Sequence, residues 1–163
     1  MENKVAGGYC LAAIRIMIGW MMIWPFFDKL FGLGFQTGRG QGWVDGTSPS
    51  SFVNYVSGGF FGDFFNAIGG TLVVDILMML ALLVFGITLM LGFASKITTI
   101  GMTAFLLTMY LLHVPPTDNP LIDYHIVWIA SLLAVYYLGG YDILSINEKW
   151  KGSWLAKRFP ILA

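Results

Sequence analysis

Residues 71–93, TLVVDILMMLALLVFGITLMLGF, decide the fold, because Asp75 is their only charged side chain. A helix needs about 20 mostly apolar residues to cross the hydrocarbon core of a bilayer. This stretch meets that length, and three shorter apolar stretches accompany it at about residues 9–27, 97–113 and 121–138. The sequence therefore predicts an all-α membrane protein built as a bundle of four transmembrane helices.

The composition supports a membrane protein and excludes several other classes. The chain has 163 residues, of which 57% are hydrophobic and 11% are charged, and its formal net charge is zero. Soluble domains carry about 25% charged residues, so a typical soluble enzyme is excluded. A neutral chain without a basic patch is also unsuited to binding nucleic acid. Cys10 is the only cysteine, so we expect neither a thiol relay nor a cysteine metal site.

Lysine and arginine counts predict the orientation, since cytoplasmic loops are enriched in these residues. Two basic residues, Lys29 and Arg39, fall on one side of the predicted spans. Six fall on the other side, namely Lys4, Lys96, Lys149, Lys151, Lys157 and Arg158. We therefore expect a multi-pass protein of the cell inner (plasma) membrane with both termini in the cytoplasm. Residues 1–147 form the predicted membrane domain, and residues 148–163 an amphipathic cytoplasmic tail.

Residues 31–70 form the predicted outer loop, which is far longer than an ordinary connection between helices. Ser48 and Pro49 favour a helix start, and aromatic residues at helical spacing follow them. The pattern is typical of a helix lying in the membrane interface, although Gly58 and Gly59 allow two short pieces. The loop acts either as a cap over the bundle or as a lid over a ligand entrance.

Ionisable residues gather at the outer end of the predicted bundle. Both histidines and all the membrane-embedded acids lie there, together with one lysine; they are Asp28, Lys29, Asp75, His113, Asp123 and His125. Charges inside a membrane are costly and are often functional. Asp75 is therefore expected either to exchange a proton or to form a structural pair with Lys29.

Arg15 is expected nearer the cytoplasmic end, too far from Asp75 for a direct pair. Its neighbours on the same helix face, Ala12 and Gly19, indicate close helix packing. Arg15 therefore serves either topology and packing or the function of the site.

The two histidines leave two readings open. Each imidazole could hydrogen-bond a quinone carbonyl and pass a proton, which would make His113, His125, Asp75 and the flanking Asp123 catalytic. Alternatively, the imidazoles are structural and bond Asp118 or Asp123. Haem ligation is the less favoured use of the pair, because the tandem motifs of haem bundles are missing.

Trp20 and Trp24 lie one helical turn apart, nearer the outer end of the first predicted span. They form either an aromatic wall for a flat ring or an interfacial belt. On the first reading they belong to the cofactor-binding set, with Arg15, Asp28 and Lys29.

Three segments together resemble the DoxX/DoxD family of four-helix membrane proteins. They are RIMIGWMMIWPFFDKL at residues 15–30, LGFASKITTIGMTAFLL across the second and third spans, and DNPLIDYHIVWIASLLAVYYLGGYDILSI around the fourth. The resemblance covers roughly residues 10–147 and is nearest to the DoxD-like membrane subunit of thiosulfate:quinone oxidoreductase.

The resemblance implies respiratory electron transfer from thiosulfate to a quinone cofactor, together with a second small subunit. Membrane lipid and other membrane subunits are the other expected partners. The alternative is a non-catalytic accessory or scaffold subunit of a larger respiratory complex. We expect quinone rather than a metal as the cofactor.

Overall fold

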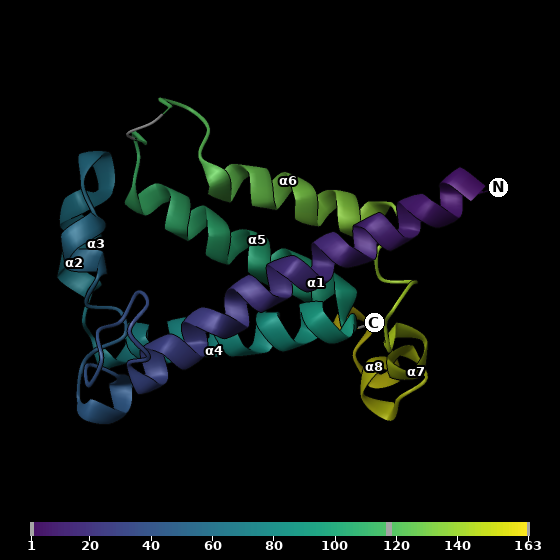
Figure 1. Cartoon of the computed structure of the whole chain (residues 1–163), viewed down its shortest axis with the longest axis horizontal. Coiled ribbons are helices and arrows are strands. Elements are labelled where there is room, and N and C mark those ends of the chain that lie inside the picture. Colours follow the sequence, from purple (N-terminus) through teal and green to yellow (C-terminus); the bar gives the residue numbers. More distant parts are fainter. Residues whose placement is uncertain (1, 117–118, 163) are drawn as a thin grey trace.

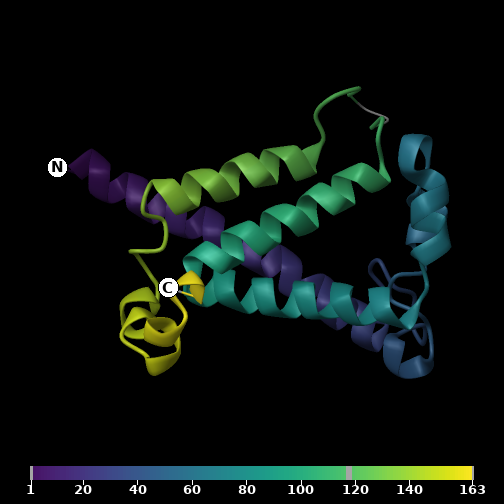
Figure 2. The same ribbon diagram turned by 180° about the vertical axis from the view of Figure 1, so that it is seen from behind.

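The computed structural model describes residues 2–116 and 119–162, and these residues are helical or irregular, with no strand among them. The long helices are α1 (Glu2–Phe31), α4 (Leu72–Leu91), α5 (Ser95–Leu112) and α6 (Tyr124–Tyr137). They run alternately back and forth, so that both termini lie toward the same end (Figures 1 and 2). We call that end the terminal end and the opposite one the loop end.

Among the residues that the structure describes, three helices are long and apolar enough to cross a membrane: α1, α4 and α5. The predicted spans at residues 9–27, 71–93 and 97–113 are thus confirmed as helices, and α1 extends beyond its prediction at both ends. The fourth predicted span is also helical, but α6 has 14 residues. Its length of about 21 Å is below that of a bilayer core.

The helices form two pairs, α1 with α4 and α5 with α6, joined by packing between α4 and α5 (Figure 1). Gly19 and Gly86 allow the first pair to cross closely. A Cβ added to Gly19 would lie 2.8 Å from the backbone nitrogen of Met90, and one on Gly86 would lie 3.2 Å from the Gly19 carbonyl oxygen. Ala12 on the same face is fully buried. The predicted close packing on this face of α1 is therefore confirmed.

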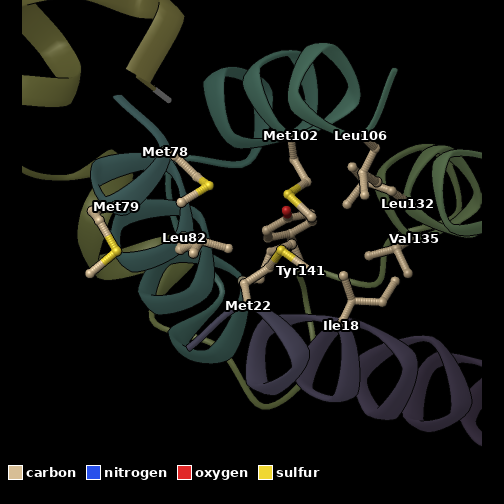
Figure 3. Close-up of a cluster of buried hydrophobic side chains, with 11 residues drawn as sticks. Ile18, Met22, Met78, Met79, Leu82, Met102, Leu106, Leu132, Val135 and Tyr141 are labelled. Atoms are coloured by element: carbon tan, nitrogen blue, oxygen red, sulfur yellow. The ribbon is translucent and has the colours of Figure 1, made fainter. Parts of the chain in front are cut away.

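Methionine and aliphatic side chains fill the core between the four long helices. Met78, Met79 and Met102 are buried there in one cluster with Tyr141, which follows α6 (Figure 3). The flexible thioether side chains fill irregular space between the helices. Burial raises the pKa of the Tyr141 hydroxyl to about 12.

The loop between α1 and α4 contains short helical pieces rather than one interfacial helix. They are η1 (Trp43–Asp45), α2 (Val53–Val56), η2 (Gly59–Phe61) and α3 (Gly62–Ile68). Helix α2 ends before Gly58 and Gly59, so the alternative of short pieces is confirmed. The predicted helix start at Ser48 is wrong, because α2 begins at Val53 and the Ser48 hydroxyl bonds Asp75 instead.

The chain after α6 folds into α7 (Asn147–Lys151), α8 (Trp154–Arg158) and η3 (Pro160–Leu162) at the terminal end (Figure 1). Trp150 packs on Phe93 in the α4–α5 turn, with 4.8 Å between ring centroids. Trp154 is 75% exposed beside the exposed Lys157 and Arg158. The tail therefore presents an aromatic side chain and basic side chains together, as an amphipathic segment does.

Candidate functional site

A cavity of ≈ 740 Å³ opens between the two helix pairs at the loop end. We call it the aromatic cavity, because its lining includes six aromatic side chains: Trp20, Trp24, Phe52, Phe105, Tyr124 and Trp128. Its volume falls within the range of about 300–1,000 Å³ that is usual for small-molecule sites. The cavity therefore has the size and the flat apolar walls to hold an aromatic ring.

Five of the predicted site residues line this cavity: Trp20, Trp24, Lys29, His113 and His125. They come from α1, the end of α5 and the start of α6. The Trp20 and Trp24 rings lie one turn apart, tilted by 35° with 5.7 Å between their centroids. The sequence prediction that tryptophans of the first helix and the two histidines meet at one site agrees with this arrangement.

Asp123 fixes the position of His125 through hydrogen bonds to its backbone and to its ring. As the N-cap of α6, its Oδ1 accepts hydrogen bonds from the backbone nitrogens of His125 and Ile126, at 2.9 and 3.2 Å. Its Oδ2 lies 2.6 Å from His125 Nδ1. A carboxylate that already accepts two backbone bonds is an acceptor at both oxygens, so Nδ1 of His125 carries the hydrogen. Only Nε2 of this buried imidazole is left for a ligand.

His113 also has its Nδ1 atom in a hydrogen bond, but with a backbone carbonyl rather than a carboxylate. It is the C-cap of α5, and its Nδ1 lies 3.0 Å from the carbonyl oxygen of Met109, one turn back. A carbonyl oxygen can only accept, so Nδ1 of His113 is also the protonated nitrogen. The two rings lie 5.9 Å apart between centroids with 27° between their planes. The site therefore contains two neighbouring imidazoles whose Nε2 atoms are both without a partner among the described residues.

Lys29 is the cation in the lining of the aromatic cavity. Its Nζ lies 4.6 Å from the centroid of the Phe52 ring, a cation–π contact. The sequence prediction that Lys29 pairs with Asp75 is wrong, since no carboxylate among the described residues lies within ion-pair distance of Nζ. The ammonium group is thus held by an aromatic face and stays available to a polar atom in the cavity.

Asp75 has a structural environment outside the aromatic cavity. Its Oδ1 accepts hydrogen bonds from the Ser48 hydroxyl at 2.7 Å, the Ser50 backbone nitrogen at 2.8 Å and the Ser50 hydroxyl at 2.6 Å. The buried carboxylate ties the long loop to the first turn of α4, where the helix dipole also favours a negative charge. Nothing in this geometry connects Asp75 to the two histidines.

Asp28 also stabilises the loop rather than lining the cavity. Its buried carboxylate accepts hydrogen bonds from the backbone nitrogens of Phe35, Gln36 and Thr37, at 3.2, 2.9 and 2.8 Å. These bonds turn the chain back over the end of α1. As a result Phe35 packs edge-on against Trp24, with 5.0 Å between centroids, and Gln36 enters the cavity lining. Asp28 therefore shapes the cavity from outside it.

Arg15 lies toward the terminal end, and its guanidinium group is fully buried. Its five N–H groups donate to backbone carbonyls of two segments. In α4 the acceptors are Leu89 and Met90, at 2.5 and 3.3 Å. After α6 they are Gly140, Ile143 and Leu144, at 3.0, 3.1 and 2.7 Å. Arg15 therefore packs the bundle together, and the structure shows no direct pair with Asp75, as the sequence predicted.

Sequence reasoning missed several lining residues, including Phe52, Phe105 and Gln36. Phe52 and Gln36 come from the long loop, whose path depends on the buried Asp28 and Asp75 carboxylates. Asp118, a predicted partner of the histidines, lies outside the described residues. No group of three or more histidine, cysteine or acidic side chains suited to a metal ion occurs among residues 2–116 and 119–162.

Comparisons of the chain with protein-family models, with curated proteins and with solved structures find no match. The family resemblance drawn from the sequence therefore stays a prediction. Conclusions about function must come from the geometry of the aromatic cavity.

Proposed function

We propose that the chain is an integral membrane protein of respiratory electron transfer that binds a quinone in the aromatic cavity. The observation that carries the proposal is the convergence of three tryptophans, two imidazoles and one lysine on a single cavity of ≈ 740 Å³. A quinone head group is a flat ring with polar oxygens at its edge. Aromatic walls suit the ring, and N–H groups suit the carbonyl oxygens.

The proposed membrane topology has four crossings, with α6 as the fourth. Apolar residues before and after α6, such as Leu121, Ile122 and Leu138, are exposed and lengthen its apolar stretch. A short span is accommodated by local thinning of the bilayer at modest cost. Both termini lie at the same end (Figures 1 and 2), as an even number of crossings requires. We place that end in the cytoplasm because six of the eight flanking basic residues lie there.

Five lining residues have a role in the proposed complex. Trp20 and Trp24 would pack on the faces of the ring, and His113, His125 and Lys29 would face the oxygens at its edge. When bound, a quinone accepts two electrons and two protons to become a quinol. From the family resemblance we propose thiosulfate as the electron donor, two molecules of which release two electrons on joining to form tetrathionate. We expect the donor site on a partner subunit.

Isothermal titration calorimetry tests the proposal by measuring the binding of a short-chain quinone to the purified protein in nanodiscs. We expect His125→Ala to weaken binding about tenfold, the equivalent of one hydrogen bond worth about 1.4 kcal/mol. Trp24→Leu should weaken binding too, whereas Trp154→Leu in the exposed tail serves as the matched control. Absence of quinone binding by the unmodified protein, or equal binding by all variants, would refute the proposal.

A second candidate function is that of a non-catalytic subunit in a larger membrane complex. The specific observation in its favour is an exposed aromatic surface on the loop, where Tyr55, Phe60 and Phe64 are 86%, 83% and 61% exposed. Native co-purification separates the two functions. If the chain co-purifies with other membrane subunits but binds no quinone, its function is that of an accessory subunit.

A further inference from the structure

We propose that the histidine pair couples quinone binding to proton uptake, so that the quinone takes a proton into the site and the quinol does not. This inference rests on the function proposed above. It follows from the hydrogen bonds that fix the tautomers of both rings.

Both imidazoles, when neutral, offer a ligand only a lone pair. Nδ1 of His113 donates to the Met109 carbonyl, and Nδ1 of His125 donates to the Asp123 carboxylate. The hydrogen of each neutral ring is therefore already committed, and Nε2 can only accept. A quinol hydroxyl can donate to such an atom. A quinone carbonyl can only accept, so it finds no donor in the neutral pair.

One added proton removes this mismatch. A proton taken up from solvent forms an N–H bond at Nε2, and this group donates to the quinone carbonyl oxygen, while no bond between heavy atoms forms or breaks. His125 is the ring that should hold the proton, because the Asp123 carboxylate at 2.6 Å stabilises its imidazolium form. His113 has only a backbone carbonyl at its Nδ1, so its cationic form lacks an equivalent partner.

A second cavity gives the proton a way in. It has a volume of ≈ 540 Å³ at the loop end and is lined by His113, Asn119, Asp123 and Tyr124, among others. His113 and Tyr124 line both cavities, and Asp123 lines the second one while bonding His125 in the first. The carboxylate–imidazole pair thus connects the two spaces.

The charged and titratable groups around the pair favour one proton over two. Asp123 and Tyr124 face His125 from the start of α6, with the Tyr124 ring 4.1 Å away between centroids. His113 faces it from α5, and Lys29 lies in the same cavity lining from α1. From α4 the lining holds Met78 and Leu82, and from the loop Gln36, Phe52 and Val56, none of which is charged. With one carboxylate present, a second proton would meet the repulsion of both the imidazolium and the ammonium.

The test measures proton uptake on ligand binding in weakly buffered detergent solution with a pH-indicator dye. A short-chain quinone is added in one experiment and its quinol in another. We expect uptake of about one proton per quinone and none per quinol at a pH where the free pair is neutral. Over that range the quinone Kd should rise about tenfold per pH unit while the quinol Kd stays constant.

Asp123→Asn provides the sharpest variant, because asparagine remains a good N-cap. Its amide can donate to Nδ1 of His125, which moves the imidazole hydrogen to Nε2 and supplies the donor without a proton. Quinone binding by this variant should become independent of pH and take up no proton. Asp63→Asn, which changes an exposed carboxylate on α3, should behave like the unmodified protein.

The results separate this inference from the function on which it rests. Binding of both ligands with equal proton uptake, or unchanged uptake in Asp123→Asn, would overturn the coupling and leave the quinone site standing. Failure of both ligands to bind would overturn the proposed function itself. His113→Gln gives a second check, since uptake should persist while the His125–Asp123 pair is intact, and its loss would contradict the assignment of the proton to His125.

Discussion

Replacing Arg15 with methionine should destabilise the bundle more than any other single charge removal. The side chain donates five hydrogen bonds to carbonyls of α4 and of residues 140–144. Methionine occupies a similar volume but offers no donor, so carbonyl groups buried around it lose their partner. No carboxylate is involved, and the partners lost are these backbone carbonyls and the face of the Tyr141 ring, whose centroid lies 5.5 Å from the Arg15 Cζ atom.

The size of the effect can be bounded from this geometry. Hydrogen bonds to a charged group contribute about 1.5–3 kcal/mol each, but some of these carbonyls, at the end of α4 and after α6, can relax. A buried acceptor left without a partner costs about 1–3 kcal/mol, so two such carbonyls account for the range of about 3–5 kcal/mol that we adopt for Arg15→Met. Arg15→Lys should cost about half as much, because an ammonium group has three donors rather than five.

Thermal unfolding in detergent, followed by tryptophan fluorescence, measures the loss. A destabilisation of 3–5 kcal/mol lowers the Tm of a chain of this size by about 10 °C. Arg158→Met, at an exposed position of the tail, is the matched control and should leave the Tm unchanged. An Arg15→Met variant that unfolds at the same temperature as the unmodified protein would refute the structural role assigned to Arg15.

Three further predictions concern other parts of the molecule. Asp75→Ala should cost about 2–3 kcal/mol, because it leaves the donors of the partly buried Ser48 and the buried Ser50 unpaired, and should speed hydrogen exchange of residues 46–52 as measured by mass spectrometry. Gly86→Val should cost about 1–3 kcal/mol by overpacking the α1–α4 crossing, and Gly7→Val, with open space around it, should not lower the Tm. The Tyr141 pKa is about 12, against 10.0 in the unfolded chain, so the unfolded state loses its proton first as the pH rises. The free energy of unfolding should therefore fall by about 2–3 kcal/mol between pH 10 and 12. In Tyr141→Phe the free energy of unfolding should fall less over this range, and an equal fall would contradict the burial of this hydroxyl.

The long apolar helices could be predicted because their signal is local. Residues 71–93 contain one charge in a continuous apolar run, and α4 matches them closely. The predicted meeting of Trp20, Trp24 and the two histidines also follows from local features. Each lies near the same end of its helix, and alternation of direction brings those ends together.

Packing was one of the two roles predicted for Arg15, but the partners of Arg15 and Asp28 could not be predicted, because they are backbone groups. Carbonyls at Leu89 or Gly140 and N–H groups at residues 35–37 leave no mark in the side-chain pattern. Sequence reasoning looks for an opposite charge, and it therefore offered Lys29 as the partner of Asp75. The loop geometry supplies two serines instead, which the spacing of charges alone does not reveal.

The Arg15 contacts also set an order for how the protein is made. Arg15 leaves the ribosome with the first helix, yet the nearest acceptor of its guanidinium group in sequence lies 74 residues later and the farthest lies 129 residues later. Until those residues emerge, the cation must wait among lipid headgroups, the translocation machinery or water. The hydrogen bonds of Arg15 can all form only once the turn after α6 has been synthesised. A nascent chain truncated before residue 140 should therefore be a substrate for quality control rather than a partly assembled protein.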